Sequence, residues 1–468
     1  MDISESPPNP IGLFSNLERE HGFESVEVVG ELPEGLEGTL YLNGGGIFEQ
    51  FGKRYDHIFE SDGAITAVRI SGGKACTSSR IVQSTGLIEE RKRGKHLGSF
   101  AAKWPTRFYR MLFGGRKNTS NTHIVPWQKN LYALNEASRP VRINSETLET
   151  IGETDLDGVI TSSFSAHPHR VDSRECLFNF GMTYGKETFI TVYILPDIGP
   201  AKTLCKVSIA HPVMLHDFTV TENHIVFFIP PARVKIWRMM LALKPFQDNI
   251  AWKPGFGTEV IIIPIDSPSN IIRFHTSPFM QFHFAGAFEN EGEISVDYIW
   301  YKNSSLLGAL GDGMNVSWSD LDSQVHGKLH RANIDIDGRA LVTEPLWDGN
   351  SEYPQISTKD ENGKYQHTWM QTSEEVDGQL RFSISRLDAN QMISHHKLEA
   401  GQICLEPVLA TGDGRSFVMS MVFDSYTQKS NLIILDAETL LLEAKIIMSQ
   451  TIPLTFHGSW VDSSNGCH

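Results

Sequence analysis

The sequence predicts a large all-β protein, either a β-propeller or a barrel. Between Leu32 and Asp462, short β-branched and aromatic runs alternate with Gly, Asn, Asp or Pro, as in GTLYLNG, AITAVRISGG, EVIIIPID and LRFSISRLD. This pattern is typical of antiparallel strands joined by tight turns. A propeller of seven four-stranded blades needs about 15 residues per strand and turn, which this length supplies. No WD or kelch repeat accompanies the pattern, so it does not by itself separate the two folds.

The chain is expected to form one domain over residues 1–468, because the strand pattern runs through it without a linker. Hydrophobic residues make up 40% of the sequence and charged residues 21%, which is enough for a large core. The 41 basic and 56 acidic residues give a net charge of −15. A general nucleic-acid binder is therefore excluded, since it needs cations to replace phosphate counterions. The sequence indicates no obligate protein partner.

The cysteines and the N-terminal segment indicate the compartment. The five cysteines lie far apart without a C-x-x-C pair: Cys76, Cys176, Cys205, Cys404 and Cys467. A disulfide framework and a zinc–thiolate site are both disfavoured. The opening MDISESPPNPIG lacks the basic and apolar regions of a signal peptide, and no apolar run is long enough to span a membrane. We therefore expect a cytoplasmic protein, with peripheral membrane association as a further option.

Two segments interrupt the β pattern and predict helical caps inserted at about 100–118 and 231–255. They are KWPTRFYRMLFGGRK (103–117) and RVKIWRMMLALKPF (233–246), which mix large apolar residues with cations. The expected apolar faces are Phe108, Met111 and Leu112 in the first, and Val234, Trp237, Met240 and Leu241 in the second. Basic amphipathic helices on an acidic protein indicate a membrane-surface patch. The alternative is that their apolar faces cover the β body.

Motifs of other enzyme classes are absent from the sequence. Gly46–Lys53 resembles a phosphate-binding loop but has five residues between its glycines, and Arg54 stands where Ser or Thr is needed. There is no H-E-x-x-H and no G-x-S-x-G. His216 and Asp217 are adjacent, so they do not form the H-x-D part of a facial triad.

Four of the eighteen histidines stand at the edges of strand-like segments beside turn residues. They are His167 in SAHPHR, His216 in MLHDF, His283 in QFHFAG and His457 in TFHGSW. Their wide separation fits no local metal motif, and a lone histidine is more often a hydrogen-bonded structural residue. The residues alone therefore leave a metal role open.

Ten segments occur in the order that is typical of one enzyme family. They are GLEGTLYLNGG, HIFESDGAITAVRI, NTHIVPWQKNLYALNEASRP, SAHPH, LHDFTVTENHIVFF, FHFAGAFENEGEISVD, EYPQIS, CLEPVLA, NLIILDAETL and FHGSW. On these segments the chain resembles the carotenoid cleavage oxygenases, nearly from end to end. The resemblance implies a seven-bladed β-propeller with Fe²⁺ on its axis and a helical or loop cap over the top face. It also implies cleavage of a conjugated C=C bond by dioxygen, giving two carbonyl products from an apocarotenoid or carotenoid.

The resemblance further implies the site residues. The iron ligands would be His167, His216, His283 and His457. Strand alternation would place His167 and His169 on one face, so only the family pattern selects His167; His123 in NTHIV has no ligand counterpart. The partners of the ligands would be Glu136, Glu352 and Glu406, since a ligating imidazole usually needs its second N–H anchored by a carboxylate. Thr122 matches a residue that crowds one coordination position in some members.

The substrate is the open part of the prediction. Asn135 stands before Glu136, where stilbene-cleaving members tend to have a lysine that holds a phenol, whereas the LYLNGGGIFEQFGKR segment is closest to bacterial apocarotenoid-cleaving members. An apolar polyene would enter from a membrane through 103–117 and 233–246, with Trp104, Phe108 and Trp237 at the tunnel mouth. The alternatives are phenylpropene or stilbene cleavage, a retinoid isomerohydrolase-like activity, and a carotenoid-binding propeller without catalysis.

Overall fold

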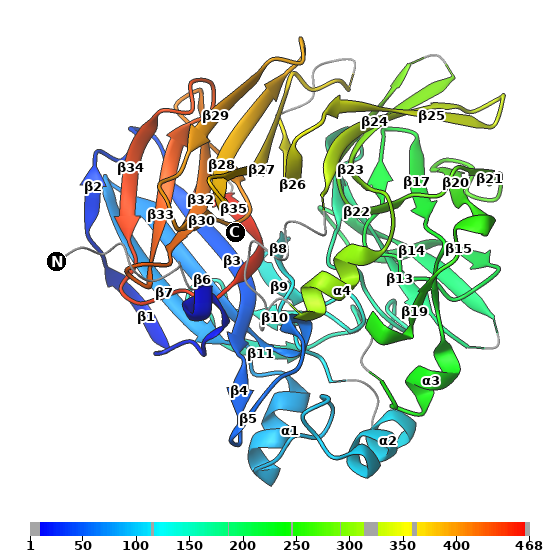
Figure 1. Ribbon diagram of the computed structural model, residues 1–468, viewed down its shortest axis with the longest axis horizontal. Coiled ribbons are helices and arrows are strands. Elements are labelled where there is room, and N and C mark those ends of the chain that lie inside the picture. Colours follow the sequence, from blue (N-terminus) through cyan, green and yellow to red (C-terminus); the bar gives the residue numbers. More distant parts are fainter. Residues whose placement is uncertain are drawn as a thin grey trace.

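Seven antiparallel sheets surround one axis in the structure (Figure 1), which confirms the seven-bladed β-propeller. The structure is a computed structural model that describes residues 10–113, 117–185, 187–244, 247–290, 292–312, 326–357 and 363–463. Five blades have four strands, and the first and last blades have additional strands from the chain termini. Cys467 lies outside the described residues.

Blades 2 to 6 follow one another along the chain, each with its innermost strand first. Blade 2 contains β8 (His123–Trp127), β9 (Asn130–Leu134), β10 (Val141–Ile143) and β11 (Thr150–Glu153), and blade 3 contains β12 (His169–Val171), β13 (Cys176–Thr183), β14 (Thr188–Pro196) and β15 (Lys202–Ile209). Blade 4 contains β16 (Thr219–Val220), β17 (His224–Ile229), β20 (Thr258–Pro264) and β21 (Ile272–Thr276). Blade 5 contains β22 (Met280–Asn290), β23 (Glu293–Tyr301), β24 (Lys328–Asp335) and β25 (Ala340–Trp347), and blade 6 contains β26 (Asn350–Ile356), β27 (His367–Val376), β28 (Gln379–Asp388) and β29 (Ile393–Lys397).

Both chain termini close the ring. Blade 1 contains β1 (His21–Ser25), β3 (Gly38–Ile47), β6 (Asp62–Ser71), β7 (Lys74–Ile81) and the C-terminal strand β35 (Thr455–Asp462). Blade 7 contains β30 (Gln402–Cys404), β31 (Val408–Gly412), β32 (Arg415–Asp424), β33 (Lys429–Asp436), β34 (Leu442–Ile447) and the N-terminal strand β2 (Val28–Gly30). β35 pairs with β3, and β2 pairs with β34, so each terminus completes a blade from the other end of the chain. This closure covers the sheet edges that an open ring would expose.

The core lies between neighbouring blades, where inward and outward faces of adjacent sheets meet. The largest cluster joins blades 1, 6 and 7 and includes Leu40, Phe417 and Phe423, all fully buried. The apolar runs of β17 and β20 pair in register, so that Val226 lies opposite Ile262. Both faces of these two strands are buried between blades, which explains why their sequences are continuously apolar rather than alternating.

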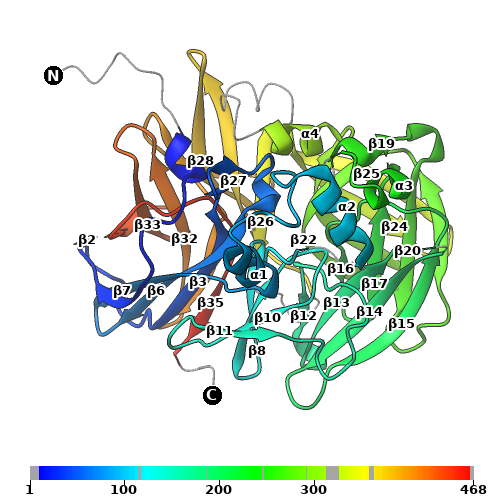
Figure 2. The same cartoon turned by 90° about the horizontal axis from the view of Figure 1, so that it is seen from below.

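The helices gather on one face of the ring, which we call the helical face (Figures 1 and 2). They are α1 (Thr85–Arg93), α2 (Trp104–Phe113), α3 (Ile236–Met240) and α4 (Ser305–Asp312), with the hairpin of β18 (Ala232–Val234) and β19 (Ile250–Trp252) beside them. Short two-stranded β4 (Glu49–Gln50) and β5 (Lys53–Arg54) and the 3-10 turns η1 (Pro10–Phe14), η2 (Ile58–Glu60), η3 (Asp172–Arg174), η4 (Gln247–Asn249) and η5 (Pro254–Phe256) complete the fold. No helix among the described residues is long and apolar enough to cross a membrane.

The helix predicted over 103–117 forms over Trp104–Phe113 as α2, with residues 114–116 outside the described part of the chain, whereas the helix predicted over 233–246 is mostly wrong. Among the described residues of that segment only the five of α3 are α-helical, and residues 245 and 246 lie outside the described part. Val234, which was expected on the apolar helix face, lies in β18 and pairs with Ile250 of β19. The hairpin buries Val234 against the blades, and this tertiary contact overrides the local helical pattern.

Candidate metal centre

The propeller axis is lined by one histidine or glutamate from each blade. The innermost strands contact one another around the axis, as β35 does with β8 and β22 does with β26. The lining residues are His123 on β8, His167 before β12, His216 before β16, His283 on β22, Glu352 on β26, Glu406 after β30 and His457 on β35. The wide sequence spacing of the histidines therefore reflects one contribution per blade.

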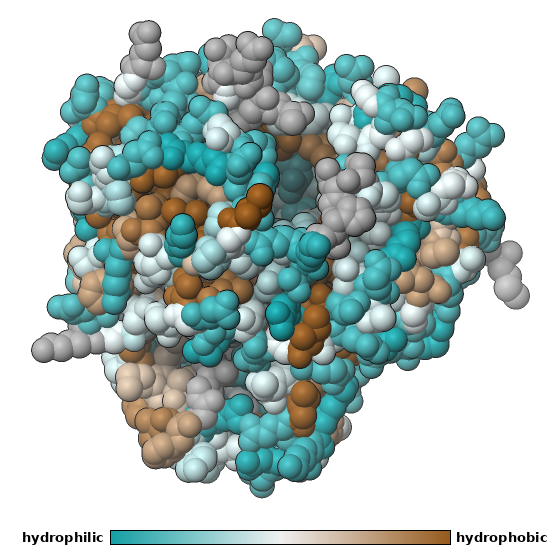
Figure 3. Space-filling model, turned by 180° about the vertical axis from the view of Figure 1, so that it is seen from behind, coloured by the Kyte–Doolittle hydropathy of each residue, from teal (hydrophilic) through white to brown (hydrophobic). Residues whose placement is uncertain are grey.

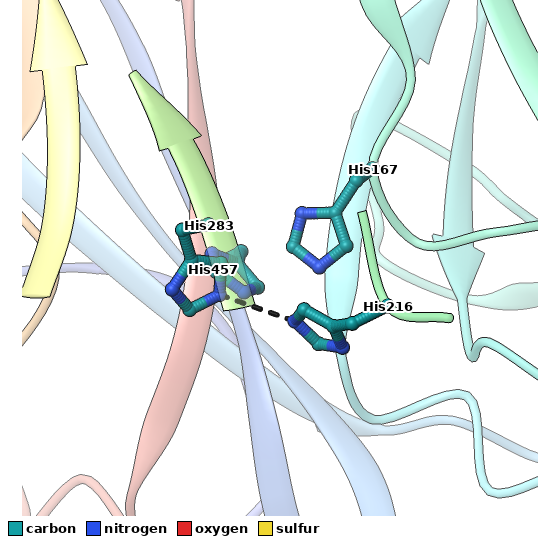
Figure 4. A group of neighbouring side chains, drawn as sticks. All are labelled: His167, His216, His283 and His457. Atoms are coloured by element: carbon teal, nitrogen blue, oxygen red, sulfur yellow. Dashed lines mark hydrogen bonds between the residues drawn. The ribbon is translucent and has the colours of Figure 1, made fainter. Parts of the chain in front are cut away.

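Four of these side chains form a single buried cluster. His167, His216, His283 and His457 each present one ring nitrogen, and these nitrogens all lie within 4.8 Å of one another. Figure 4 shows the four imidazoles turned toward a common centre, from four separate segments. Four buried imidazoles are a ligand set that suits iron, copper, nickel or zinc.

Glutamates hold the outer nitrogens of three of the four rings. His283 Nδ1 lies 2.5 Å from Glu352 Oε2, and His457 Nδ1 lies 2.8 Å from Glu406 Oε1. His216 Nδ1 lies within ion-pair distance of a Glu136 carboxylate oxygen. The structure thus pairs each predicted glutamate with a different histidine. A carboxylate at Nδ1 fixes the proton there and leaves the Nε2 lone pair free for a metal.

The inner nitrogens then face one another without a proton between them. His216 Nε2 lies 3.2 Å from His283 Nε2, which is the dashed contact in Figure 4. Because a carboxylate lies at Nδ1 of each ring, the ring proton is favoured there and both Nε2 atoms are acceptors, and two acceptors at this distance repel. A cation between them removes the repulsion, so the geometry fits a bound metal ion.

The fourth ring, His167, has no carboxylate partner in the described ranges. Its side chain is buried, and its Nε2 makes no hydrogen bond among the described residues. Burial, followed by the neighbouring imidazoles, holds the pKa of His167 well below its usual value. The ring is therefore neutral, which is the protonation state that binds a metal.

Charge pairing keeps two of the glutamates ionised in the buried site. Burial alone would raise the pKa of Glu352, but His283 outweighs this and lowers it. Burial likewise raises the pKa of Glu406, but the opposing effect of His457 is larger, so the pKa is lowered overall. Additional donors support both carboxylates: the Tyr301 hydroxyl contacts Glu352, and the Gly458 amide donates to Glu406 Oε2 over 2.8 Å.

Two other histidines near the axis make bonds that exclude them from the cluster. His123 Nδ1 lies 2.7 Å from the Ala166 carbonyl, and its Nε2 lies 3.3 Å from the Gly458 carbonyl. His169 Nε2 lies 2.8 Å from Asp217 Oδ1. The structure therefore brings His167, rather than His169, to the other three rings.

Sequence reasoning missed Asp217 and Tyr353. Asp217 accepts the backbone N–H of Phe218 over 2.7 Å and that of Phe284 over 3.0 Å, so it ties the turn after His216 to the strand that carries His283. Tyr353 has a left-handed backbone (φ 53°), and its ring stacks on His283 with 5.2 Å between centroids. Each directly follows a predicted site residue in the sequence, and this position was the signal that could have found it.

A cavity extends from the helical face to residues beside the cluster. Near the cluster it is lined by Thr122, Asn135 and Glu136, and on the helical face by Arg107 and Met111 of α2, Met239 of α3 and Leu307 of α4. The Thr122 carbonyl accepts the His457 amide over 3.2 Å, which places Thr122 beside that ring. The apolar part of the lining suits a long apolar molecule.

The aromatic residues expected at the mouth do not line this cavity. Trp104 stacks on Phe108 with 5.4 Å between centroids, and the Trp104 indole donates to the Leu241 carbonyl over 3.0 Å. Trp237 is 63% exposed on the outside of α3. The prediction for these three residues was wrong because the helices turn their Arg and Met side chains, rather than these rings, toward the cavity.

Comparisons with known proteins agree with this geometry. The model of the retinal pigment epithelial membrane protein (RPE65) family matches residues 14–462. The apocarotenoid-15,15'-oxygenase of Synechocystis is 25% identical, with 98% of this chain and 97% of that protein covered. The resveratrol cleavage oxygenase 1 of Aspergillus fumigatus is 26% identical, with 97% and 95% covered.

Solved structures give the same result for the fold. An ACO/RPE65 chimera superposes with a TM-score of 0.87 at 25% identity, covering 98% of this chain and 99% of that one. The cobalt-substituted Synechocystis oxygenase superposes with a TM-score of 0.88 at 24% identity, covering 98% and 100%.

Proposed function

This chain belongs to the RPE65/carotenoid oxygenase family and is an iron-dependent oxygenase, and we propose that His167, His216, His283 and His457 hold its Fe²⁺. We propose further that the enzyme cleaves a conjugated C=C bond of an apocarotenoid or carotenoid into two carbonyl products. The observation that carries the proposal is the convergence of four buried imidazoles, three of them oriented by their own glutamate.

The side chains around the cluster orient the ligands, balance the charge of the metal and restrict access to it. Glu136, Glu352 and Glu406 fix the ring orientations and supply negative charge against the metal cation. Ferrous iron, when bound to neutral imidazoles, supplies the one-electron chemistry that allows dioxygen to react with an alkene. Thr122 lines the cavity beside His457, and we propose that it restricts access to one coordination position.

The cavity lining favours a polyene over a phenolic stilbene. Its apolar side chains include Phe59, Phe100, Met111, Met214 and Met239, which fit a conjugated chain. Asn135 occupies the position before Glu136, and its amide donates to Thr119 Oγ1 over 2.7 Å. The stilbene alternative therefore lacks the lysine expected there to hold the phenol.

Incubation with a substrate panel tests the activity. Iron-loaded protein is given apocarotenals, carotenes, stilbenes and a retinyl ester, and the products are identified by mass. We expect two carbonyl fragments from an apocarotenal or carotene. Products only from the retinyl ester favour the isomerohydrolase alternative. Binding of polyenes without any product from the iron-replete protein favours the non-catalytic alternative.

We also propose that the helical face docks on a membrane surface. Apolar side chains project from α2 and α3 into solvent: Tyr109 (66% exposed), Phe113 (74%) and Trp237 (63%). Figure 3 views the molecule from the opposite side, so that only the edge of the helical face is visible there, as brown surface at the lower left. The cavity opens between the same helices, so docking would give an apolar substrate a path that avoids water.

Vesicle co-sedimentation tests this docking. We expect wild type to bind vesicles that contain anionic lipid, and Phe113→Ser with Trp237→Ser to reduce binding by about tenfold or more, because each large apolar side chain contributes about 1.5–3 kcal/mol on burial. Ile198→Ser is the matched control, since Ile198 is 92% exposed outside these helices. An equal loss of vesicle binding in the control would contradict the proposed surface.

We propose a cytoplasmic location, which the four unpaired cysteines among the described residues support.

A further inference from the structure

One carboxylic acid in the cavity wall has an unsatisfied oxygen. Glu60 ends the 3-10 turn η2 and lines the cavity. Its Oε1 accepts the Phe100 amide over 2.9 Å. Its Oε2 is buried and makes no hydrogen bond within the described part of the chain. Leaving a buried polar atom without a partner costs about 1–3 kcal/mol, so a structural role alone does not explain it.

The Glu60 backbone is anchored beside the metal centre. The Asn121 side-chain amide donates to the carbonyls that flank Glu60, over 3.3 Å to Phe59 and 2.8 Å to Ser61. Asn121 directly precedes Thr122, which lines the same cavity. The Phe59 ring packs on Phe456, with 5.4 Å between centroids, next to the ligand His457. Glu60 is therefore fixed close to where a bound substrate must pass.

Glu60 forms no ion pair with a cation in the described part of the chain. Lys117 lines the cavity too, but its Nζ lies 2.7 Å from both Asp62 and Glu90, which already balance its charge. His57 is neutral, because burial lowers its pKa to about 4. Burial raises the pKa of Glu60 itself to about 7; the Phe100 amide, the Asp56 amide and Lys117 oppose this, whereas the Asp56 carboxylate adds to it. The Asp56 amide does not satisfy Oε2.

We propose that Glu60 determines specificity by hydrogen bonding to a hydroxyl group on one end of the polyene substrate. The inference rests on the polyene-cleaving function proposed above and names the substrate class more narrowly. A hydroxyl group suits this position in either protonation state of Glu60, because it donates to a carboxylate and accepts from a carboxylic acid. A carbonyl group can only accept, so it would bind the protonated form alone.

A matched pair of substrates tests the inference. Iron-loaded protein is given two apocarotenals of equal length, with and without a hydroxyl group on the ring. We expect wild type to show a kcat/KM about tenfold or more higher for the hydroxylated compound, carried by KM, since one hydrogen bond to a buried charged group has about this value. Glu60→Leu should bring the ratio close to one while the deoxy compound is still cleaved. Glu60→Gln, which keeps hydrogen-bonding atoms, should retain part of the preference.

Met111→Leu is the control, because it changes an apolar position in the same cavity and should leave the ratio unchanged. Equal kcat/KM for the two compounds in wild type would overturn the inference and leave polyene cleavage intact. Cleavage of neither compound would instead contradict the proposed function. In that case, quenching of tryptophan fluorescence measures the affinity for each compound. Wild type should bind the hydroxylated compound about tenfold more tightly, and equal affinities would overturn the inference about Glu60. If Glu60→Leu does not fold, the wild-type ratio and Glu60→Gln decide.

Discussion

Glu60 should make the protein less stable as the pH rises through neutrality, and Glu60→Gln should remove this dependence. The carboxyl has a pKa of 4.5 in an unfolded chain and about 7 in the folded protein. Between these values the folded state holds a proton that the unfolded state has lost, so the free energy of unfolding falls with increasing pH. Each pKa unit corresponds to about 1.36 kcal/mol, which gives an upper limit of about 3 kcal/mol above pH 7.

Glu60→Gln replaces the acid with a neutral group of the same shape that can still accept the Phe100 amide. Relative to wild type it should be unchanged in stability near pH 4.5 and more stable by up to about 3 kcal/mol near pH 8. For 468 residues, an unfolding entropy of about 2.1 cal/mol/K per residue converts this into a rise in Tm of about 3 °C.

Thermal unfolding at several pH values measures this difference. Wild type and Glu60→Gln are compared at each pH from 5 to 8.5, so that effects common to both proteins, including iron binding, cancel. The exposed Glu34 provides the control Glu34→Gln, which should show no pH-dependent difference. An effect of Glu60→Gln on stability that is equal at all pH values, or largest at low pH, would refute the conclusion that burial disfavours the charged form of Glu60.

Three further predictions concern the closing strand, the partner glutamates and the buried lysine. His457→Ala should lose iron but keep a near-native melting profile in the iron-free form. Deletion from Thr455 removes β35 from β3 and should lower Tm as well. An iron-replete His457→Ala protein would refute the assignment of His457 as a ligand. Glu406→Gln should weaken iron binding about 10–100-fold in a metal-competition titration, and the exposed Glu399→Gln should not. Lys117→Met leaves Asp62 and Glu90 buried without their cation and should cost about 3–5 kcal/mol; a Tm equal to that of wild type would contradict the buried triad.

Local sequence patterns predicted individual strands better than their long-range partners. The runs that form β17 and β20 were visible because burial on both faces makes them continuously apolar. The pairing of β35 with β3 joins residues from opposite ends of the chain, and no local pattern records it. The second cap helix failed for the same reason, since Val234 is held in a strand by Ile250.

The residues of the site could be predicted from the sequence, but the contacts between them could not. Alternation along the AHPH segment left His167 and His169 equivalent, and only the family pattern chose between them. The structure adds the physical reason, because Asp217 holds His169 away from the cluster. Glu60 was not predicted, since its unpartnered oxygen and raised pKa arise from three-dimensional burial that the HIFESDG segment does not reveal.

Labelling with ¹⁸O₂ tests directly whether the protein acts as an iron-dependent oxygenase. Iron-loaded protein is given an apocarotenal under ¹⁸O₂, and the products are reduced to alcohols at once so that their oxygen cannot exchange with water. Oxygenase chemistry at the four-histidine iron predicts that the label enters the newly formed carbonyl groups, and that His283→Ala yields no labelled product. Products that carry only oxygen from water would contradict oxygenase chemistry.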